Sequence, residues 1–263
     1  MKNEQIILYL FLLLMFKVYP KNIVLLTLPK SGTNLVLKLL KQLSGKNELL
    51  NVNSLIPLNI ESLDKNIHWG HEWIFGLDPR GKLEPTSEKI ELLKKLEVKL
   101  ILLVRDPRQH IITLLKTINK PINDFNLNWA IVNFPEVLYE STGTYAFLQY
   151  QDINSIYKNY LRWKKEYPFV YITFFEKLVG PKGSGSYKVQ IDEIKKISKF
   201  LDIEIDDLEI NKIAEDLFGD TPTFREGKIS SWKKYYSNIS KTCFKNFSGN
   251  LLSILGYETS NDW

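Results

Sequence analysis

A short apolar run followed at once by a glycine-containing loop and a periodic segment constrains this chain more than any other feature. Residues 23–26 form the run, residues 27–34 the loop, and residues 35–43 a segment in which leucine and valine recur at helical spacing. This order predicts a strand, a tight loop and a helix. Gly32 permits close backbone approach in the loop. A helix that begins here directs free N–H groups and its positive dipole end at the loop, so the segment predicts a site for the phosphates of a nucleotide.

Further apolar runs alternate with helical patterns along the chain. Residues 98–104 and 170–175 are nearly continuous apolar runs, typical of strands buried on both faces, and residues 66–71 predict a shorter strand. Helices are expected over residues 87–96, 107–116, 153–166, 191–201 and 208–218, and a loop with at most a short helix over residues 45–66. Such alternation predicts an α/β fold with one domain, residues 21–263, and a mostly parallel central sheet flanked by helices.

The composition suits a globular protein with an anionic ligand. The chain has 263 residues, 44% of them hydrophobic, a net charge of +5 and a pI near 9.0, enough for one large α/β domain. Its lysines are scattered and the sequence has no zinc-finger or aromatic RNA-binding motif, so we expect no nucleic-acid partner. The single cysteine, Cys243, excludes an intrachain disulfide and a cysteine-based zinc site.

The N-terminus, residues 1–20, is treated as a separate segment. Residues 6–16 are eleven apolar residues in a row, short for a membrane span, which needs about 20. The length suits a signal-peptide core, but no cleavage site follows. Three alternatives stay open: a helix packed on the domain or touching a membrane, a membrane anchor, and a cleaved signal. We expect a cytoplasmic protein that can associate with a membrane through this segment. Location in a membrane of the secretory pathway is the alternative.

The loop does not have the usual nucleotide-binding pattern. The Walker pattern needs Gly, four residues, and then Gly-Lys-Ser/Thr, whereas here the lysine precedes the glycine. The loop reads Pro29-Lys30-Ser31-Gly32-Thr33-Asn34. It resembles the 5′-phosphosulfate loop of the sulfotransferases that use PAPS, 3′-phosphoadenosine 5′-phosphosulfate. The resemblance implies that residues 30–34 bind the 5′ end of PAPS and that Lys30 also acts in catalysis by stabilising the leaving group. An ordinary strand-to-helix turn with a surface lysine is the alternative.

A second motif follows the apolar run at residues 98–104. Arg105 comes directly after it, and Asp106 and Pro107 are a good N-cap and first residue for the next helix. The sulfotransferases hold the 3′-phosphate of PAPS with Arg-Asn/Asp-Pro and a serine eight residues after the arginine, where this chain has Thr113. A guanidinium matches phosphate oxygens and a hydroxyl adds a donor. The alternative for Arg105 is a structural salt bridge.

A third motif spans residues 225–233. Arg225, Gly227 and Trp232 have the spacing of the family's Arg-Lys-Gly…Trp-Lys pattern, which implies that Arg225 and the backbone at Gly227 close over the 3′-phosphate. Glu226 stands where lysine is usual and adds a negative charge. A fourth likeness is the strand end at residues 174–178, similar to the family's Tyr-Glu-Asp-Leu, with Phe175 at the position of the tyrosine.

Histidine is the favoured general base because its pKa lies near neutrality. His71 resembles the catalytic histidine of the cytosolic sulfotransferases, which ends a strand between the two phosphate motifs. His68 and Glu72 are alternatives. The third histidine, His110, is expected to be exposed to solvent.

One position departs from the family. Leu35 stands where the cytosolic enzymes usually place a tryptophan that stacks on adenine, so Phe218 or Phe224 is the alternative partner of the adenine ring. Because of this departure, the acceptor class of the cytosolic enzymes cannot be assigned to this chain. We expect residues 121–148 to form a lid or acceptor-binding region.

The resemblance as a whole implies a metal-independent sulfotransferase. It would move the sulfuryl group of PAPS to a hydroxyl or amine of a small-molecule or glycan acceptor and release adenosine 3′,5′-bisphosphate (PAP). Two alternatives remain. One is a P-loop small-molecule kinase using Mg·ATP, against which the missing Walker lysine argues. The other is a nucleotide-binding relative without catalysis, attached to a membrane.

Overall fold

The central sheet of the computed structural model is entirely parallel. The structure describes residues 22–46, 48–51, 66–70, 84–143, 152–219, 227–260 and 262–263. Within them the strand order is β2-β3-β1-β4-β5, and every neighbouring pair is parallel. The strands are β1 (Asn22–Thr27), β2 (Glu48–Asn51), β3 (Asn66–Gly70), β4 (Val98–Val104) and β5 (Val170–Phe174). The predicted α/β fold with a parallel sheet is confirmed.

Strand β2 differs from the prediction. It lies in the segment expected to be a loop, and it pairs only with β3 at the edge of the sheet. A four-residue strand with two apolar residues is too short to produce a recognisable apolar run.

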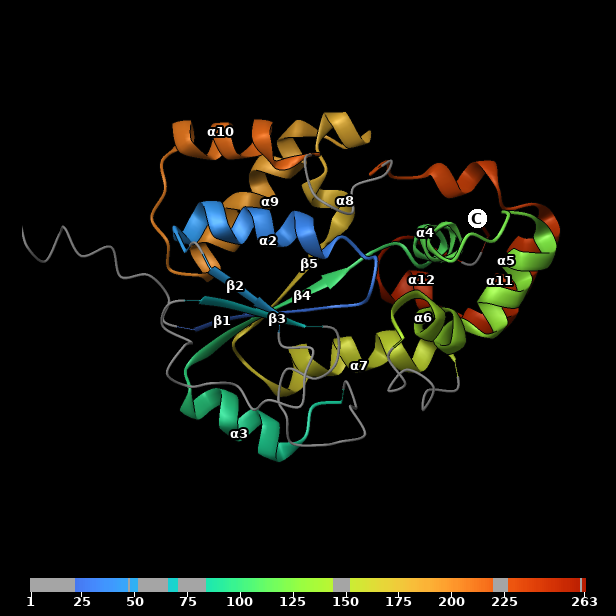
Figure 1. Cartoon of the computed structure of the whole chain (residues 1–263), viewed down its shortest axis with the longest axis horizontal. Coiled ribbons are helices and arrows are strands. Elements are labelled where there is room, and N and C mark those ends of the chain that lie inside the picture. Colours follow the sequence, from blue (N-terminus) through green and yellow to red (C-terminus); the bar gives the residue numbers. More distant parts are fainter. Residues whose placement is uncertain are drawn as a thin grey trace, which may run out of the picture.

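Helices cover both faces of the sheet and its carboxyl edge (Figure 1). They are α2 (Thr33–Ser44), α3 (Ser87–Lys95), α4 (Pro107–Thr117), α5 (Asp124–Val132), α6 (Phe134–Thr142), α7 (Ile153–Glu166), α8 (Phe175–Leu178), α9 (Tyr187–Phe200), α10 (Asp207–Leu217), α11 (Asn238–Ser248) and α12 (Leu251–Ile254). Two 3₁₀ turns, η3 (Pro181–Gly183) and η4 (Ser231–Lys234), join them. Several helices begin where a side chain accepts a backbone N–H, as Asp106 does for α4 and Asp152 for α7.

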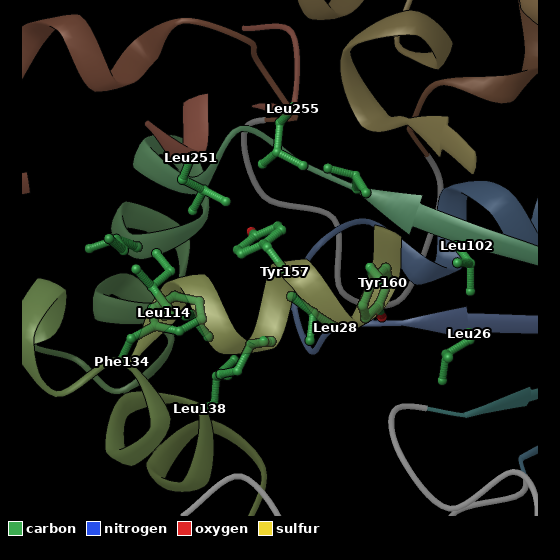
Figure 2. Close-up of a cluster of buried hydrophobic side chains, with 14 of the residues drawn as sticks. Leu26, Leu28, Leu102, Leu114, Phe134, Leu138, Tyr157, Tyr160, Leu251 and Leu255 are labelled. Carbon is green, nitrogen blue, oxygen red and sulfur yellow. The ribbon is translucent and has the colours of Figure 1, made fainter. Parts of the chain in front are cut away.

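The two faces of the sheet build two separate cores. Ile23 and Leu25 of β1 pack with α2, α9 and α10, whereas Val24 and Leu26 pack with the helices on the other face. Successive side chains of a strand point to opposite faces, so a strand covered on both sides must be apolar throughout. Figure 2 shows the second core, where Tyr157 and Tyr160 of α7 lie among leucines of β1, β4 and α4.

The region expected to bind the acceptor contributes to this core in its described part. Residues 121–143 contain α5 and α6, whose buried side chains include Leu127, Ile131, Phe134 and Leu138. These residues are therefore core residues, and contact between this region and an acceptor stays a prediction.

No helix in the described residues is long and apolar enough to cross a membrane. The segment of residues 1–20, with its three alternatives, lies outside the described residues.

Candidate nucleotide site

The two predicted phosphate motifs meet at the carboxyl edge of the sheet. Thr27 at the end of β1 pairs with Leu103 near the end of β4, so the segments that follow these strands leave the sheet side by side. Arg105 Nη1 donates a hydrogen bond to the carbonyl oxygen of Lys30 at 3.0 Å. Ligands of open parallel sheets bind at this edge, and the structure thus brings the two motifs together there.

The loop before α2 has the backbone of an anion site. Lys30 and Gly32 have φ angles of 61° and 117°, both in the left-handed region. A Cβ on Gly32 would lie 2.4 Å from Cδ2 of Phe175, so only glycine fits here. The first turn of α2 has no side-chain cap and no acidic residue. The positive dipole end of α2 therefore meets no acidic side chain in its own first turn, which favours an anion there.

Three hydroxyl groups predicted to bind phosphate are engaged within the protein. Ser31 Oγ donates to the Leu28 carbonyl oxygen at 2.7 Å, and Thr33 Oγ1 lies 2.8 Å from Thr27 Oγ1. Thr113 Oγ1 donates to the Gln109 carbonyl oxygen at 3.0 Å. In this conformation the donors left for a phosphate are mainly backbone N–H groups and cationic side chains. The roles of the three hydroxyls, and of the half-buried Asn34, stay predictions.

Arg105 is a buried cation with unused hydrogen-bonding capacity. Its side chain is 6% exposed and its Cζ lies 4.3 Å from the centroid of the Phe175 ring. Burial lowers the pKa of Arg105, and the nearby charge of Glu176 opposes that effect. Nε is buried without a hydrogen-bond partner, and the described residues form no ion pair with this guanidinium. Since a buried charge without a paired group is costly, these features fit an anionic ligand better than a structural salt bridge.

Glu176 lies near enough to Arg105 to act on its charge, and it was not predicted to be part of the site. Its Oε1 accepts the Asp106 N–H at 2.9 Å and its Oε2 accepts the Tyr257 hydroxyl at 2.7 Å. Burial, and then the charge of Asp106, raise the pKa of Glu176. The one local signal was an acidic residue just after a buried strand.

The third motif docks on the helix that carries Arg105. Gln109 Oε1 accepts the Ser231 hydroxyl at 2.8 Å and the Trp232 N–H at 2.9 Å. Gly227 has a φ of 60°. Sequence reasoning missed Gln109, a buried polar side chain one turn after Arg105. Arg225, the other predicted ligand of this motif, lies outside the described residues.

The expectation that His110 is exposed was wrong. Its side chain is 0% exposed. Nε2 lies 2.6 Å from the Pro29 carbonyl oxygen and Nδ1 lies 3.0 Å from the Tyr157 hydroxyl. Helical spacing suggested an outer face for this residue, but α4 is covered by α5, α6 and η4, which lie later in the sequence.

The other candidates for the base are only partly described. His68 lies within β3 opposite Val24 and is 2% exposed, so it lies inside the sheet, away from the strand end. Gly70 ends β3 and pairs with Leu26 of β1. His71 and Glu72 follow in the sequence and lie outside the described residues.

Leu35 belongs to the core beneath α2. It is 7% exposed and packs in the cluster with α9 and α10. A leucine is suited to that position because it faces the protein interior. Of the two aromatic alternatives, Phe218 lies next to Gly183, where a Cβ would approach its ring to 2.7 Å, and Phe224 lies outside the described residues.

Comparison with known proteins finds similarity in structure alone. No family model matches the sequence, and no curated protein matches it significantly. Among solved structures, mouse sulfotransferase SULT7A1 complexed with PAP is similar at a TM-score of 0.56 and 17% identity, over 88% of this chain and 84% of that one. Retinol dehydratase in complex with androsterone and inactive cofactor PAP is similar at a TM-score of 0.53 and 14% identity, over 89% and 81%. The chain therefore has the sulfotransferase fold.

Proposed function

We propose that the chain is a sulfotransferase that moves the sulfuryl group of PAPS to a hydroxyl or amine of a small-molecule or glycan acceptor and releases PAP. The observation that carries this proposal is that two anion sites, the uncapped α2 N-terminus and the buried Arg105, lie in contact. The contact is the hydrogen bond from Arg105 to the carbonyl oxygen of Lys30. A nucleotide with phosphates at both the 3′ and 5′ positions matches two such sites, whereas ATP carries one phosphate chain. The fold that the chain shares with two PAP-bound proteins adds support.

Lys30 and the α2 N-terminus would act on the donor. During transfer the acceptor atom forms a bond to sulfur while the bond between sulfur and the bridging oxygen breaks, and the electron pair stays on that oxygen of PAP. A lysine and a helix N-terminus at this position stabilise the developing negative charge. As in phosphoryl transfer, positioning and electrostatics supply most of the rate.

The acceptor must lose a proton as it attacks. His71 is the proposed base, with His68 and Glu72 as alternatives. The place of β3 supports this assignment, because its last residue, Gly70, pairs with Leu26 beside the phosphate loop. The roles of Arg225 and Gly227 at the 3′-phosphate belong to the same proposal.

The test is transfer of labelled sulfate from PAPS to a broad library of hydroxyl and amine acceptors. We expect transfer to persist in EDTA. Lys30→Ala should lower kcat about 10²- to 10³-fold, the size of effect that removal of one oxyanion-stabilising donor has in other enzymes. Lys212→Ala is the matched control, since it removes an exposed lysine of α10 and should leave the rate unchanged.

Two outcomes would favour the alternatives. Thermal stabilisation by Mg·ATP but not by PAP would indicate a kinase. Tight PAP binding without transfer to any acceptor in the library would indicate a nucleotide-binding protein without catalysis.

A further inference from the structure

Three successive carbonyl groups of the phosphate loop are each held by a donor. Leu28 O accepts from Ser31, through both its N–H and its hydroxyl. Pro29 O lies 2.6 Å from His110 Nε2, and Lys30 O accepts from Arg105 at 3.0 Å. The first donor belongs to the loop itself, whereas Arg105 comes from the connection between β4 and α4, and His110 from the first turns of α4. Side chains outside the loop therefore fix its backbone.

The bond to Pro29 determines where the Lys30 N–H points. The Pro29 carbonyl and the Lys30 N–H belong to one planar trans peptide and point in opposite directions. A donor on the carbonyl side thus turns the N–H away from His110. That N–H makes no hydrogen bond with the described residues. Lys30 also has a φ of 61°, a conformation that a residue other than glycine keeps only when its surroundings hold it there.

The surroundings of His110 define its orientation. A carbonyl oxygen only accepts, so Nε2 carries the hydrogen that points to Pro29. On the other side of the ring, the Tyr157 hydroxyl lies 3.0 Å from Nδ1 and 3.3 Å from the Arg105 carbonyl oxygen. The Phe134 ring makes an edge contact at 5.6 Å between centroids. The imidazole is therefore held on both sides and bridges the backbones of the two phosphate motifs.

We propose that His110 is a positioning residue of the nucleotide site. Through the Pro29 carbonyl it orients the peptide between Pro29 and Lys30, so that the Lys30 N–H faces the 5′ end of the bound nucleotide. His110 itself does not touch the nucleotide. This inference rests on the proposed function, because it takes PAP as the ligand of the loop.

Two amide substitutions separate the hydrogen bond from the space that the ring fills. In His110→Gln the side-chain nitrogen lies about where Nε2 was and can still donate to Pro29. In His110→Asn the shorter amide can reach Tyr157 but not Pro29. We expect PAP to bind about tenfold more weakly to the asparagine variant, the loss of one positioned hydrogen bond. The glutamine variant should bind PAP within about threefold of the wild-type value.

The measurements are calorimetric titration with PAP and the amide ¹H–¹⁵N signal of Lys30 in the nucleotide-free protein. The signal should move in the asparagine variant and stay near its wild-type position in the glutamine variant. A purely structural histidine would give equal losses in both variants, and that result would overturn the proposal. Equal PAP affinity in all three proteins would overturn it as well.

The design keeps the two claims apart. If the wild-type chain does not bind PAP, the proposed function is wrong and the inference falls with it. If the wild-type chain binds PAP and His110→Asn binds it equally well, only the inference is wrong. If His110→Asn does not fold, Tyr157→Phe decides, because it removes only the hydroxyl behind the imidazole. We expect that variant to bind PAP a few-fold more weakly, and an unchanged affinity with an unchanged Lys30 signal would refute the role of His110.

Discussion

Arg105 and Arg108 lie three residues apart and are 6% and 2% exposed, yet their surroundings are opposite. Arg108 hydrogen-bonds the Asp106 carboxylate through Nε and Nη2 at 3.0 and 2.8 Å, and it also pairs with Glu258. Its Cζ lies 3.8 Å from the ring centroid of Trp232 and 4.5 Å from that of Trp263. Among the described residues, Arg105 donates to one backbone carbonyl, and its buried Nε has no hydrogen-bond partner there.

The pKa values of the two arginines shift in opposite directions for this reason. Burial lowers the pKa of Arg105. For Arg108, burial acts in the same direction, but the hydrogen bonds and charge of Asp106, together with Glu258, outweigh it and raise the pKa. Burial and charge alone thus do not distinguish a structural arginine from a ligand-binding one. Unused hydrogen-bonding capacity does.

Substitution of Arg108 should have the largest effect of the changes proposed, and it should lower the free energy of unfolding. Arg108→Met leaves the Asp106 carboxylate buried without its partner, which typically costs about 3–5 kcal/mol. Urea unfolding, followed by circular dichroism, measures that loss. The folded fraction should bind PAP within a few-fold of the wild-type affinity. A stability loss below about 1 kcal/mol would show that the carboxylates do not depend on Arg108.

Arg105→Met is the matched substitution, and its effect should fall on binding. Loss of charge-assisted hydrogen bonds to a phosphate should weaken PAP binding about 10- to 150-fold in calorimetry. The free energy of unfolding without nucleotide should stay the same or rise, because the variant no longer buries an unpaired charge. If Arg105→Met instead loses stability and keeps its affinity for PAP, the two arginines have been assigned the wrong way round.

Much of the fold around these arginines could be predicted because its signals are local. The strand over residues 98–104 was predicted with its observed bounds, since an apolar run interrupted only by Lys99 is typical of a strand buried on both faces. The start of α4 was predicted from Asp106 and Pro107, which cap and begin the helix. The edge strand β2 lacked such a signal.

Residues of the site could be predicted only where they belong to a sequence motif of recognisable spacing. The spacing identified Arg105, but the partners that make Arg108 structural, Trp232 and Glu258, lie more than a hundred residues later. Burial of His110 likewise depends on helices remote in sequence. The directions of the Ser31, Thr33 and Thr113 hydroxyls depend on which backbone oxygen lies nearby, and a sequence does not contain that information.

Glu176 offers the finest test of the comparison, because it is the main nearby negative charge that opposes the lowered pKa of Arg105. The pKa of Glu176 is itself raised, first by burial and then by Asp106. The folded state therefore binds this proton more readily than the unfolded state does. Its contribution to stability is fully present below the unfolded pKa of about 4.5 and is lost as the pH rises through the folded pKa.

Glu176→Gln should remove that pH dependence while keeping the local hydrogen bonds. The amide oxygen can still accept the Asp106 N–H, and the amide N–H can donate to the Tyr257 hydroxyl oxygen. At pH 7 the variant should be more stable than the wild type, and the difference should shrink toward pH 4.5. Urea unfolding at several pH values measures it. Parallel curves for the two proteins would mean that Glu176 is ionised at no cost, and that Arg105 is better compensated within the chain than its unpartnered Nε indicates.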